Sequence, residues 1–401
     1  MKTNALFLTL SAASILTING WAQTPQLTEA AKTLPAGTLK LSANRTTFDP
    51  AKHGFKFVND FQTQIQIAGL NGPRFGGLCG GMVYASLDYY KNNLPIPSQT
   101  HRPTSGSTLH QYILNRQTNS TLLNVNGTSN ADKWSELILN PFGWRSSEFF
   151  NWGLQGSNGG RIQELVEMMS TGNPVPLGLF KAGSGGIGPH HQVLAIGYDM
   201  GRYKGDLGNY KEDFKIFIYD PNHPAETLTL RANAANQSYY YEQYPGENWM
   251  TYFVDKKYTV SRPPVIQTTT LPNDGLVRQL VLEIRTGGDD LRGGNDNVNA
   301  IVKYADGTSD VYENINNRVR WMDNYTETVM ITLRKPAALN QIRSVSLKTT
   351  FGGGIGGDNW NIDCLRIIVR EGNRENQVAY RMGTPLVRFD GNNTPFEVAI
   401  R

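Results

Sequence analysis

Apolar residues recur along this chain with two different spacings, and the change from one to the other divides it. Apolar positions three to four residues apart predict a helix that begins near Met82 and a second helix over Arg161 to Met169. After the second helix, short apolar runs predict β-strands. The strands that we expect are 175–180, 191–198, 214–219 and 251–260. Helices first and an antiparallel sheet second predict an α+β arrangement for this part of the chain.

The last third of the chain has no helical period. Between residues 276 and 401, short strand patterns alternate with turn clusters, which is typical of a β-sandwich. A stretch rich in proline and turn residues, 263–275, precedes it and indicates a linker. A chain of 401 residues is long enough for two domains. We therefore expect an enzyme-like domain over 56–262 and an all-β sandwich that serves binding over 276–401.

The start of the chain predicts export. Residues 1–22 combine Lys2, a short apolar run and small residues near Ala22, which is typical of a cleaved signal peptide and of a secreted or periplasmic protein. The polar residues 23–55 predict an extended lead-in. No later apolar run reaches the length of a transmembrane segment. A formal charge of +4 without a basic block argues against a nucleic-acid partner.

A glycine-rich stretch, Gly76-Gly77-Leu78-Cys79-Gly80-Gly81, carries the first candidate for catalysis and runs into the first predicted helix. A thiol at a helix N-terminus lies near free backbone N–H groups, which favour its thiolate. The flanking glycines let a substrate backbone approach closely. A small buried cysteine ahead of a core helix explains the same residues. This stretch alone leaves both interpretations open.

Two later motifs supply partners for the thiol. His190-His191-Gln192-Val193-Leu194 opens an apolar strand, and Asp220-Pro221 ends the next strand. A cysteine on a helix, a histidine at a strand start and an Asp-Pro after the following strand, in this order, resemble the papain-like cysteine peptidases. The Asp-Pro ending is most similar to the bacterial bacteriocin-processing branch. The resemblance covers roughly residues 56 to 260.

The resemblance implies a papain-like α+β domain, with a helical half and an antiparallel β half, that acts on a protein or peptide substrate and needs no cofactor. It implies that Cys79 attacks an acyl carbon, that His191 takes and returns the proton, and that Asp220 orients the imidazole. We assign His191 rather than His190 because, in this family, one residue and then an apolar run follow the histidine.

The sequence departs from the pattern of the family at two places near Cys79. Papain-like enzymes have a glutamine about six residues before the cysteine, and here Pro73 occupies that position. The nearest upstream amide is Asn71, which becomes the candidate second donor. No aromatic residue follows Cys79, where many of these peptidases have tryptophan. Loss of one oxyanion donor typically costs ~10²–10³ in rate.

The C-terminal part carries two further motifs. Gly357-Asp358-Asn359-Trp360 is similar to the tryptophan-containing signature of PLAT-type sandwiches, which implies a surface, lipid or glycan ligand. Asp289, Asp290 and Asp296 lie in a glycine-rich loop and are weak candidates for calcium, which prefers oxygen ligands. A solvated turn explains the loop equally simply, and we favour the turn. No other metal site is indicated.

Three functions remain open at this point. The first is a secreted cysteine hydrolase, most simply a peptidase, with an appended binding module. The second is an acyl transferase or deamidase of the transglutaminase type, which uses the same order of cysteine, histidine and aspartate. The third is a binding or adhesion protein without activity, built on a degenerate papain-like scaffold.

The two cysteines of the chain, Cys79 and Cys364, lie in different predicted domains, and we favour two free thiols over a disulfide. We predict that iodoacetamide modifies Cys79 quickly at neutral pH, because a helix N-terminus and a histidine favour its thiolate. Cys364, expected in an apolar strand, should react slowly. Mass spectrometry of peptides over a time course measures both rates. Fast labelling of Cys364, or a disulfide between the two, would contradict this prediction.

Overall fold

The computed structural model describes residues 43–67, 70–121, 145–181, 191–266, 270–352, 357–392 and 394–400, with the side chains of 62–75 left out. The predicted signal peptide at 1–22 and most of the predicted lead-in at 23–55 lie outside these residues. Leu41–Arg401 group as one compact unit. No helix in the described ranges is long and apolar enough to cross a membrane, which agrees with the absence of a predicted transmembrane segment.

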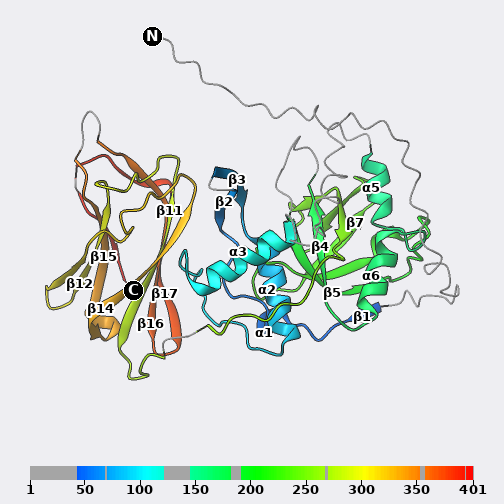
Figure 1. The fold of residues 1–401 in the computed structure, drawn as a ribbon, viewed down its shortest axis with the longest axis horizontal. Coiled ribbons are helices and arrows are strands. Elements are labelled where there is room, and N and C mark those ends of the chain that lie inside the picture. The colour runs from blue at the N-terminus through cyan, green and yellow to red at the C-terminus, as the bar shows by residue number, and fades with distance from the viewer. Residues whose placement is uncertain are drawn as a thin grey trace, which may run out of the picture. The chain divides into compact units, whose positions relative to one another are not determined.

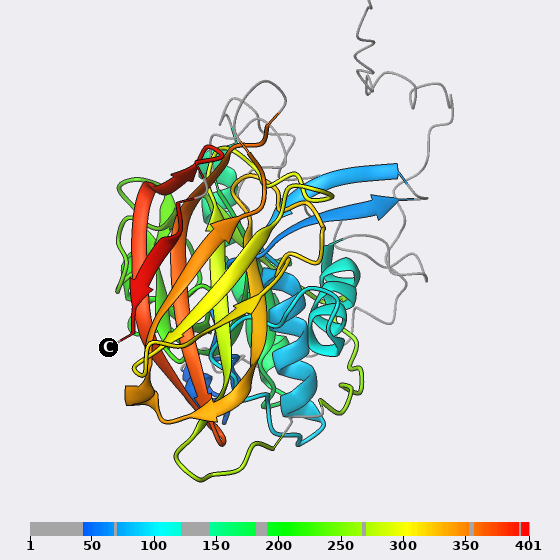
Figure 2. The same cartoon turned by 90° about the vertical axis from the view of Figure 1, so that its left-hand side faces the viewer.

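One large antiparallel sheet organises the first part of the chain. Its strands run in the order β10-β4-β5-β6-β7-β8-β9, and β1 pairs with the free end of β5. The strand bounds are β1 Ala43–Arg45, β4 Val175–Phe180, β5 His191–Asp199, β6 Lys215–Tyr219, β7 Leu228–Asn233, β8 Ser238–Tyr241, β9 Asn248–Trp249 and β10 Thr251–Val254. A separate hairpin, β2 Gln62–Ile67 and β3 Leu70–Gly76, stands out from the helices beside it (Figure 2).

The central strands β4 and β5 are buried on both faces, and this decides where the helices go. All six residues of β4 and the first eight of β5 are buried. Residues of β5 alternate between two hydrophobic clusters, because successive side chains point to opposite faces. Val193 and Ala195 belong to one cluster, and Leu194 and Ile196 belong to the other. Both faces of the sheet therefore need a covering layer.

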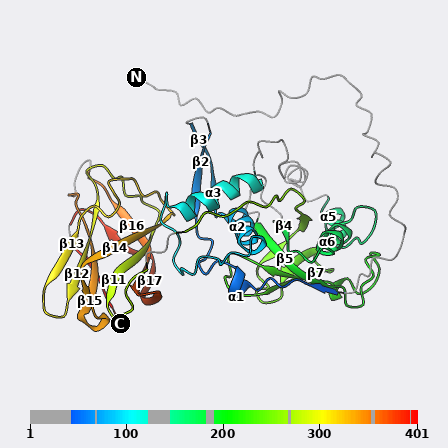
Figure 3. The ribbon, with the colours of Figure 1, turned by 60° about the horizontal axis from the view of Figure 1, so that its bottom comes forward.

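Helices supply both layers. α2 Cys79–Lys91 packs on the face of Leu194, with α3 Thr108–Thr121 against it, and the short α1 Pro50–His53 lies near α2. α5 Ser146–Trp152 and α6 Arg161–Met169 cover the opposite face. Figures 1 and 3 show α2 on one side of β4 and β5, and α5 and α6 on the other.

Residues 277–399 form two four-stranded antiparallel sheets, β14-β11-β16-β17 and β13-β12-β15-β18, that share one hydrophobic core (Figure 2). At its centre Trp360 is fully buried, and its indole N–H donates to Thr286 Oγ1 at 3.1 Å. The strand bounds are β11 Val277–Thr286, β12 Val298–Tyr304, β13 Ser309–Tyr312, β14 Thr326–Ala337, β15 Ile342–Thr349, β16 Trp360–Glu371, β17 Arg374–Phe389 and β18 Phe396–Ala399.

Polar contacts connect the two sheets with the first part of the chain. The carboxylate of Asp60 pairs with Arg102 at 3.1 Å and with Arg285 at 3.3 Å. Arg102 also pairs with Glu283 at 3.2 Å, and both of these side chains are buried. His101 lies 3.1 Å from Glu375. The division of the chain at residues 263–275 stays a prediction, and the buried pairs Arg102–Glu283 and His101–Glu375 cross it.

The predicted fold class is wrong. We expected a papain-like α+β domain, with a helical half and an antiparallel β half, followed by an all-β sandwich. The described residues are mostly β, with 39% in strands and 17% in helices, several sheets, and a half-barrel in the first part. No helical half forms among them, because a sheet buried on both faces draws its helices to both sides. Helical periodicity shows that a helix has an apolar face, but not which face of a sheet that helix covers.

Close packing of α2 on α3 depends on Gly81. A Cβ at this position would lie 2.1 Å from the backbone oxygen of Ile113 and 2.9 Å from the amide nitrogen of Gln117. We predict that Gly81→Ala lowers the free energy of unfolding by about 1–3 kcal/mol through overpacking. That loss exceeds the gain in helix propensity, which is at most about 1 kcal/mol. Urea denaturation measures the difference.

The matched control is Gly246→Ala, because nothing lies within 4 Å of a Cβ built there. It should change stability little. If Gly81→Ala is as stable as the control, the two helices are not in the tight contact described.

Candidate active site

Cys79 is the first residue of α2, and Leu78 is its N-cap without a side-chain hydrogen bond. The thiol is 8% exposed and therefore close to the surface but largely covered. The chain enters the helix through Gly77, whose φ of 90° suits glycine. A side chain at Gly77 would also collide with Asn59, at 2.6 Å from Nδ2. The glycine loop thus has a structural reason to precede this cysteine.

His191 begins β5 and connects Cys79 with Asp220. Its Nε2 lies 2.6 Å from Asp220 Oδ1, with both side chains buried. The thiol of Cys79 acts on the imidazole as well and raises its pKa. Because Nε2 faces the carboxylate, Nδ1 is the nitrogen left for the thiol. Trp249 stacks beside the ring at 5.8 Å between centroids.

The charges of this site stabilise each other. Burial alone lowers the pKa of His191, but Asp220 and the contact with Cys79 outweigh burial and raise that pKa well above its ordinary value. Burial likewise opposes ionisation of Asp220, but the charge and hydrogen bond of His191 hold the pKa of this carboxyl below its ordinary value. The pair is therefore an imidazolium and a carboxylate.

Two further donors hold Asp220. Oδ1 accepts a hydrogen bond from the backbone N–H of Asn222 at 2.7 Å, and Oδ2 accepts one from the hydroxyl of Tyr241 at 2.8 Å. Burial, and then the nearby carboxylate, raise the pKa of Tyr241 well above its ordinary value, so its hydroxyl stays a donor. These bonds satisfy a carboxylate that has no contact with solvent.

Asn59 connects the Asp220 turn with the start of α2. Its backbone N–H donates to Pro221 O at 3.0 Å, and its Nδ2 donates to Asn222 Oδ1 at 3.1 Å. Its Oδ1 accepts from the N–H of Leu78 at 2.6 Å. One side chain therefore sets the distance between the turn that carries the aspartate and the helix that carries the cysteine.

Gln192 places a second amide beside the cysteine. Its side-chain oxygen fills the space that a Cβ on Gly80 would occupy, so a larger residue at Gly80 would displace this amide. The side chain is 1% exposed, and within the described structure neither its Nε2 nor its Oε1 has a hydrogen-bond partner. The side chain of Asn71 and all of His190 lie outside the described residues. Their predicted roles stay predictions.

Cys364 lies in surroundings unlike those of Cys79. It lies in β16, is half-buried, and forms no disulfide with Cys79. Burial raises the pKa of its thiol. It lines a cavity of about 480 Å³ beside Asp60 and Arg102, and Cys79 is not among the residues that line this cavity.

The three candidate calcium ligands differ in their surroundings. Asp289 pairs with Arg388 at 3.0 Å, and Asp290 pairs with Arg320 at 2.5 Å. The backbone N–H of Asp296 closes a turn onto Gly293. Arginines therefore pair with two of the three carboxylates that we considered as calcium ligands, and the third aspartate lies in a turn with Gly293. A different group of metal-ligand side chains does converge among the described residues, next to Asp220.

Sequence reasoning missed the groups that support the site. Tyr241 stands in Ser238-Tyr239-Tyr240-Tyr241, where strand alternation alone does not distinguish one hydroxyl from another. Trp249 and Asn59 have no motif around them. Asn222 offered a signal, because an Asp followed by Pro and Asn predicts a turn in which the carboxylate accepts a backbone N–H.

Comparison with known proteins gives little support of its own. No family model matches the chain, and no curated protein matches it. Part of the chain resembles solved structures. Alpha-toxin from an avian strain of Clostridium perfringens is 18% identical with a TM-score of 0.24, over 32% of this chain and 33% of the toxin.

Two further structures are similar to the same degree. Alpha toxin from Clostridium absonum is 15% identical with a TM-score of 0.25, over 33% of each chain. The LOX variant Delta413-417:GS is 14% identical with a TM-score of 0.22, over 30% of this chain and 16% of that one. The matched part thus spans a third or less of these proteins, and matches at this level assign neither fold nor activity.

The ion pair predicts how stability depends on pH. The pKa of Asp220 is lowered in the folded protein, so Asp220 stabilises the fold fully above about pH 3.9, the pKa of an aspartate in an unfolded chain. This contribution to stability is lost as the pH falls through the pKa of the folded state. His191, with its raised pKa, stabilises the fold fully below about pH 6.5, and this is lost as the pH rises toward its folded value. Asp220→Asn should therefore destabilise most between about pH 4 and 6.5, by about 3 kcal/mol, and less at pH 9.

Urea denaturation of both proteins at pH 5 and pH 9 measures this difference. The control is Asp213→Asn, which removes an exposed ion pair with Arg202 and should have a small effect at both values. An equal loss at pH 5 and pH 9 for Asp220→Asn would show that His191 and Asp220 are not a charged pair.

Proposed function

We propose that this protein is a secreted cysteine hydrolase, most simply a peptidase, in which Cys79 is the nucleophile, His191 the general base and acid, and Asp220 the orienting carboxylate. The observation that carries this proposal is the buried hydrogen bond of 2.6 Å between Asp220 and the imidazole of His191, whose pKa the thiol of Cys79 at the start of α2 also raises. A nucleophile, a base within reach and a third group that orients the base are the arrangement that covalent acyl transfer requires.

The steps follow from which nitrogen faces which group. Because His191 is already an imidazolium, its Nδ1 carries the thiol proton from the start, and the thiolate sulfur of Cys79 attacks the acyl carbon to form a tetrahedral intermediate. Nδ1 then returns the proton to the leaving amine, which departs as an acyl-thioester forms. Water attacks the thioester with His191 as base and releases the acid. Asp220 stays ionised throughout, because it is hydrogen-bonded to Nε2 and to two other donors.

The negative charge of the intermediate needs donors, and two are at hand. The backbone N–H groups at the start of a helix are unpaired by geometry, so that of Cys79 is the first donor. We assign the second to the amide of Gln192, which lies against Gly80, the next residue of the helix. This amide is buried and lacks a hydrogen-bond partner among the described residues, so its N–H groups can donate to a substrate oxygen.

The proposal predicts a defined order of variant activities. Cleavage of a fluorogenic peptide library by the full-length protein should fall at least about a thousandfold in Cys79→Ala and in His191→Ala. Asp220→Asn should lower kcat less, because the thiol and its base remain. The control Cys364→Ser should keep full activity, since Cys364 lies in the other part of the chain.

The same assays distinguish the alternatives. Mass spectrometry of products with an added primary amine separates hydrolysis from acyl transfer, and mainly amide product would replace the hydrolase with a transferase. Activity that survives in Cys79→Ala overturns the assigned nucleophile. A wild-type protein that cleaves nothing, with a Cys79 alkylation rate that does not change in His191→Ala, would mean a binding protein rather than an enzyme.

A further inference from the structure

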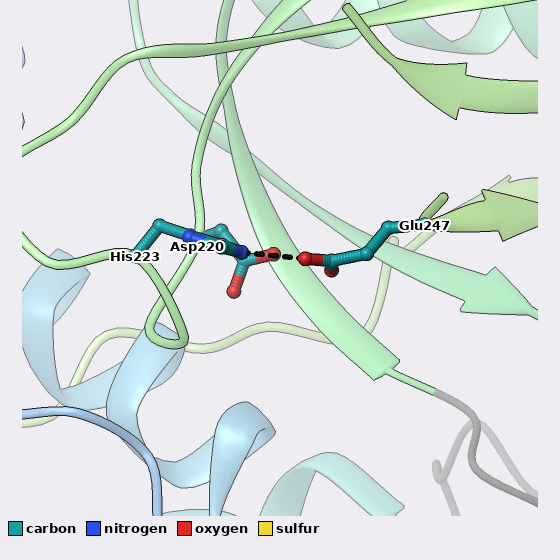
Figure 4. Close-up of side chains that lie close together, drawn as sticks. All are labelled: Asp220, His223 and Glu247. Carbon is teal, nitrogen blue, oxygen red and sulfur yellow. Dashed lines mark hydrogen bonds and ion pairs between the residues drawn. The ribbon is translucent and has the colours of Figure 1, made fainter. Parts of the chain in front are cut away.

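Three side chains with metal-binding atoms meet behind the His191–Asp220 pair. One ligand atom from each of Asp220, His223 and Glu247 lies within 4.8 Å of the other two. Figure 4 shows the ring of His223 and the carboxylate of Glu247 meeting from two different loops, with the carboxylate of Asp220 beside the ring.

The backbone holds all three in place. Asp220 and His223 are the ends of one turn, in which the N–H of His223 donates to Asp220 O at 2.9 Å. Glu247 lies in the connection between β8 and β9, where its N–H donates to Tyr244 O at 2.9 Å. The ring of His223 stacks on that of Tyr244, with centroids 4.0 Å apart. Both the carboxylate and the imidazole thus approach Asp220 on short, hydrogen-bonded connections.

The contacts leave room for a cation at Asp220. His223 Nε2 and Glu247 Oε1 are 2.9 Å apart, and this ion pair accounts for two of the three residues. It does not involve Asp220. In the hydrogen bonds of the described structure, Asp220 Oδ1 accepts two bonds and Oδ2 accepts one, from Tyr241. A carboxylate oxygen has two lone pairs, so Oδ2 keeps one for a further ligand.

We propose that Asp220, His223 and Glu247 form a binding site for a divalent transition metal of the zinc type. An imidazole and two carboxylates are ligands that zinc accepts, with a fourth position for water. The cation replaces the proton between His223 and Glu247, and that proton leaves to solvent. Small shifts of the two partly exposed side chains bring the three atoms to coordination distance.

Occupation of this site has a consequence that rests on the proposed function. A cation on Oδ2 pulls on the carboxylate whose Oδ1 positions the imidazole of His191, 2.6 Å away. The metal therefore inhibits the thiol chemistry from behind the site, without contact with the nucleophile. Coordination would link activity to the zinc concentration outside the cell.

The binding test uses the full-length Cys79→Ser protein, because zinc also binds a cysteine–histidine pair directly. Titration calorimetry with zinc chloride should give one site per chain. His223→Gln and Glu247→Gln, each in the Cys79→Ser protein, should weaken binding by about 10- to 100-fold. The control Glu242→Gln removes an exposed carboxylate of the same hairpin, paired with Arg231, and should bind as tightly as Cys79→Ser.

Melting curves check that the variants fold. Zinc should raise the Tm of Cys79→Ser and of the Glu242→Gln control, because it binds only the folded state. It should not raise the Tm of the His223→Gln and Glu247→Gln proteins. No zinc binding by Cys79→Ser, or equal binding by all four proteins, overturns the site.

The consequence is tested on proteins that keep Cys79. With zinc inhibition expressed relative to each protein's own zinc-free rate, Glu247→Gln and His223→Gln should need about 10- to 100-fold more zinc for half inhibition than the wild type and Glu242→Gln need. Equal inhibition of all four places the inhibitory zinc at Cys79 and His191 and overturns the regulatory role. A wild type without hydrolase activity counts against the proposed function alone, because the binding result does not depend on activity.

Discussion

The carboxylate of Asp220 has no contact with solvent, and the arrangement of the site follows from that constraint. A buried charge is tolerated only where it is paired and hydrogen-bonded. Asp220 meets this condition with His191, Asn222 and Tyr241, which come from a neighbouring strand, its own turn and a hairpin two strands away. Removal of any one leaves part of the charge unsatisfied. The order of β5, β6 and β8 in the sheet therefore brings the partners of Asp220 together, and the ion pair depends on it.

The cysteine reaches this pair through close backbone packing. α2 lies against β5 and α3 with glycine at the two positions that follow Cys79. Gly80 makes room for Gln192 and Gly81 makes room for α3, so the helix start approaches the histidine strand more closely than any larger residue allows. Asn59 then ties this helix start to the Asp220 turn. The glycines around Cys79, which first indicated a catalytic cysteine, also allow the start of α2 to pack closely. The same residues therefore serve both access to the thiol and packing.

The junction between the first part and the two C-terminal sheets is polar and buried. Glu283 of β11 is 5% exposed and pairs with Arg102 and Arg366. Burial by itself would raise the pKa of Glu283, but these arginines, Arg102 first, hold it below its ordinary value. Paired in this way, a buried charge specifies one docking geometry and disfavours a shifted one. A linker rich in proline does not reveal such contacts, because they join residues about 180 positions apart.

Much of the local structure could be read from the sequence. The apolar run after Pro189 is a strand that His191 opens, and the helix over Arg161 to Met169 has the predicted bounds. Such features depend on neighbours within a few residues. The predicted strand over 251–260 is shorter, since β10 ends at Val254, before the buried Asp255 that bonds with Tyr84. The strand β13 carries no apolar pattern of its own, because its residues are exposed or half-buried.

What the tertiary structure alone decided is which surfaces meet. Periodicity predicted that α2 and α6 each have an apolar side, but the two buried faces of β5 placed them on opposite sides of one sheet, and this overturned the predicted fold class. The order of Cys79, His191 and Asp220 suggested a shared site, and the structure brings His191 and Asp220 to 2.6 Å from each other. Tyr241, Gln192, His223 and Glu247 carried no signal, since a side chain beside a site is defined by distance in space. The sequence therefore determined the elements and the candidate chemistry, and long-range packing determined their partners.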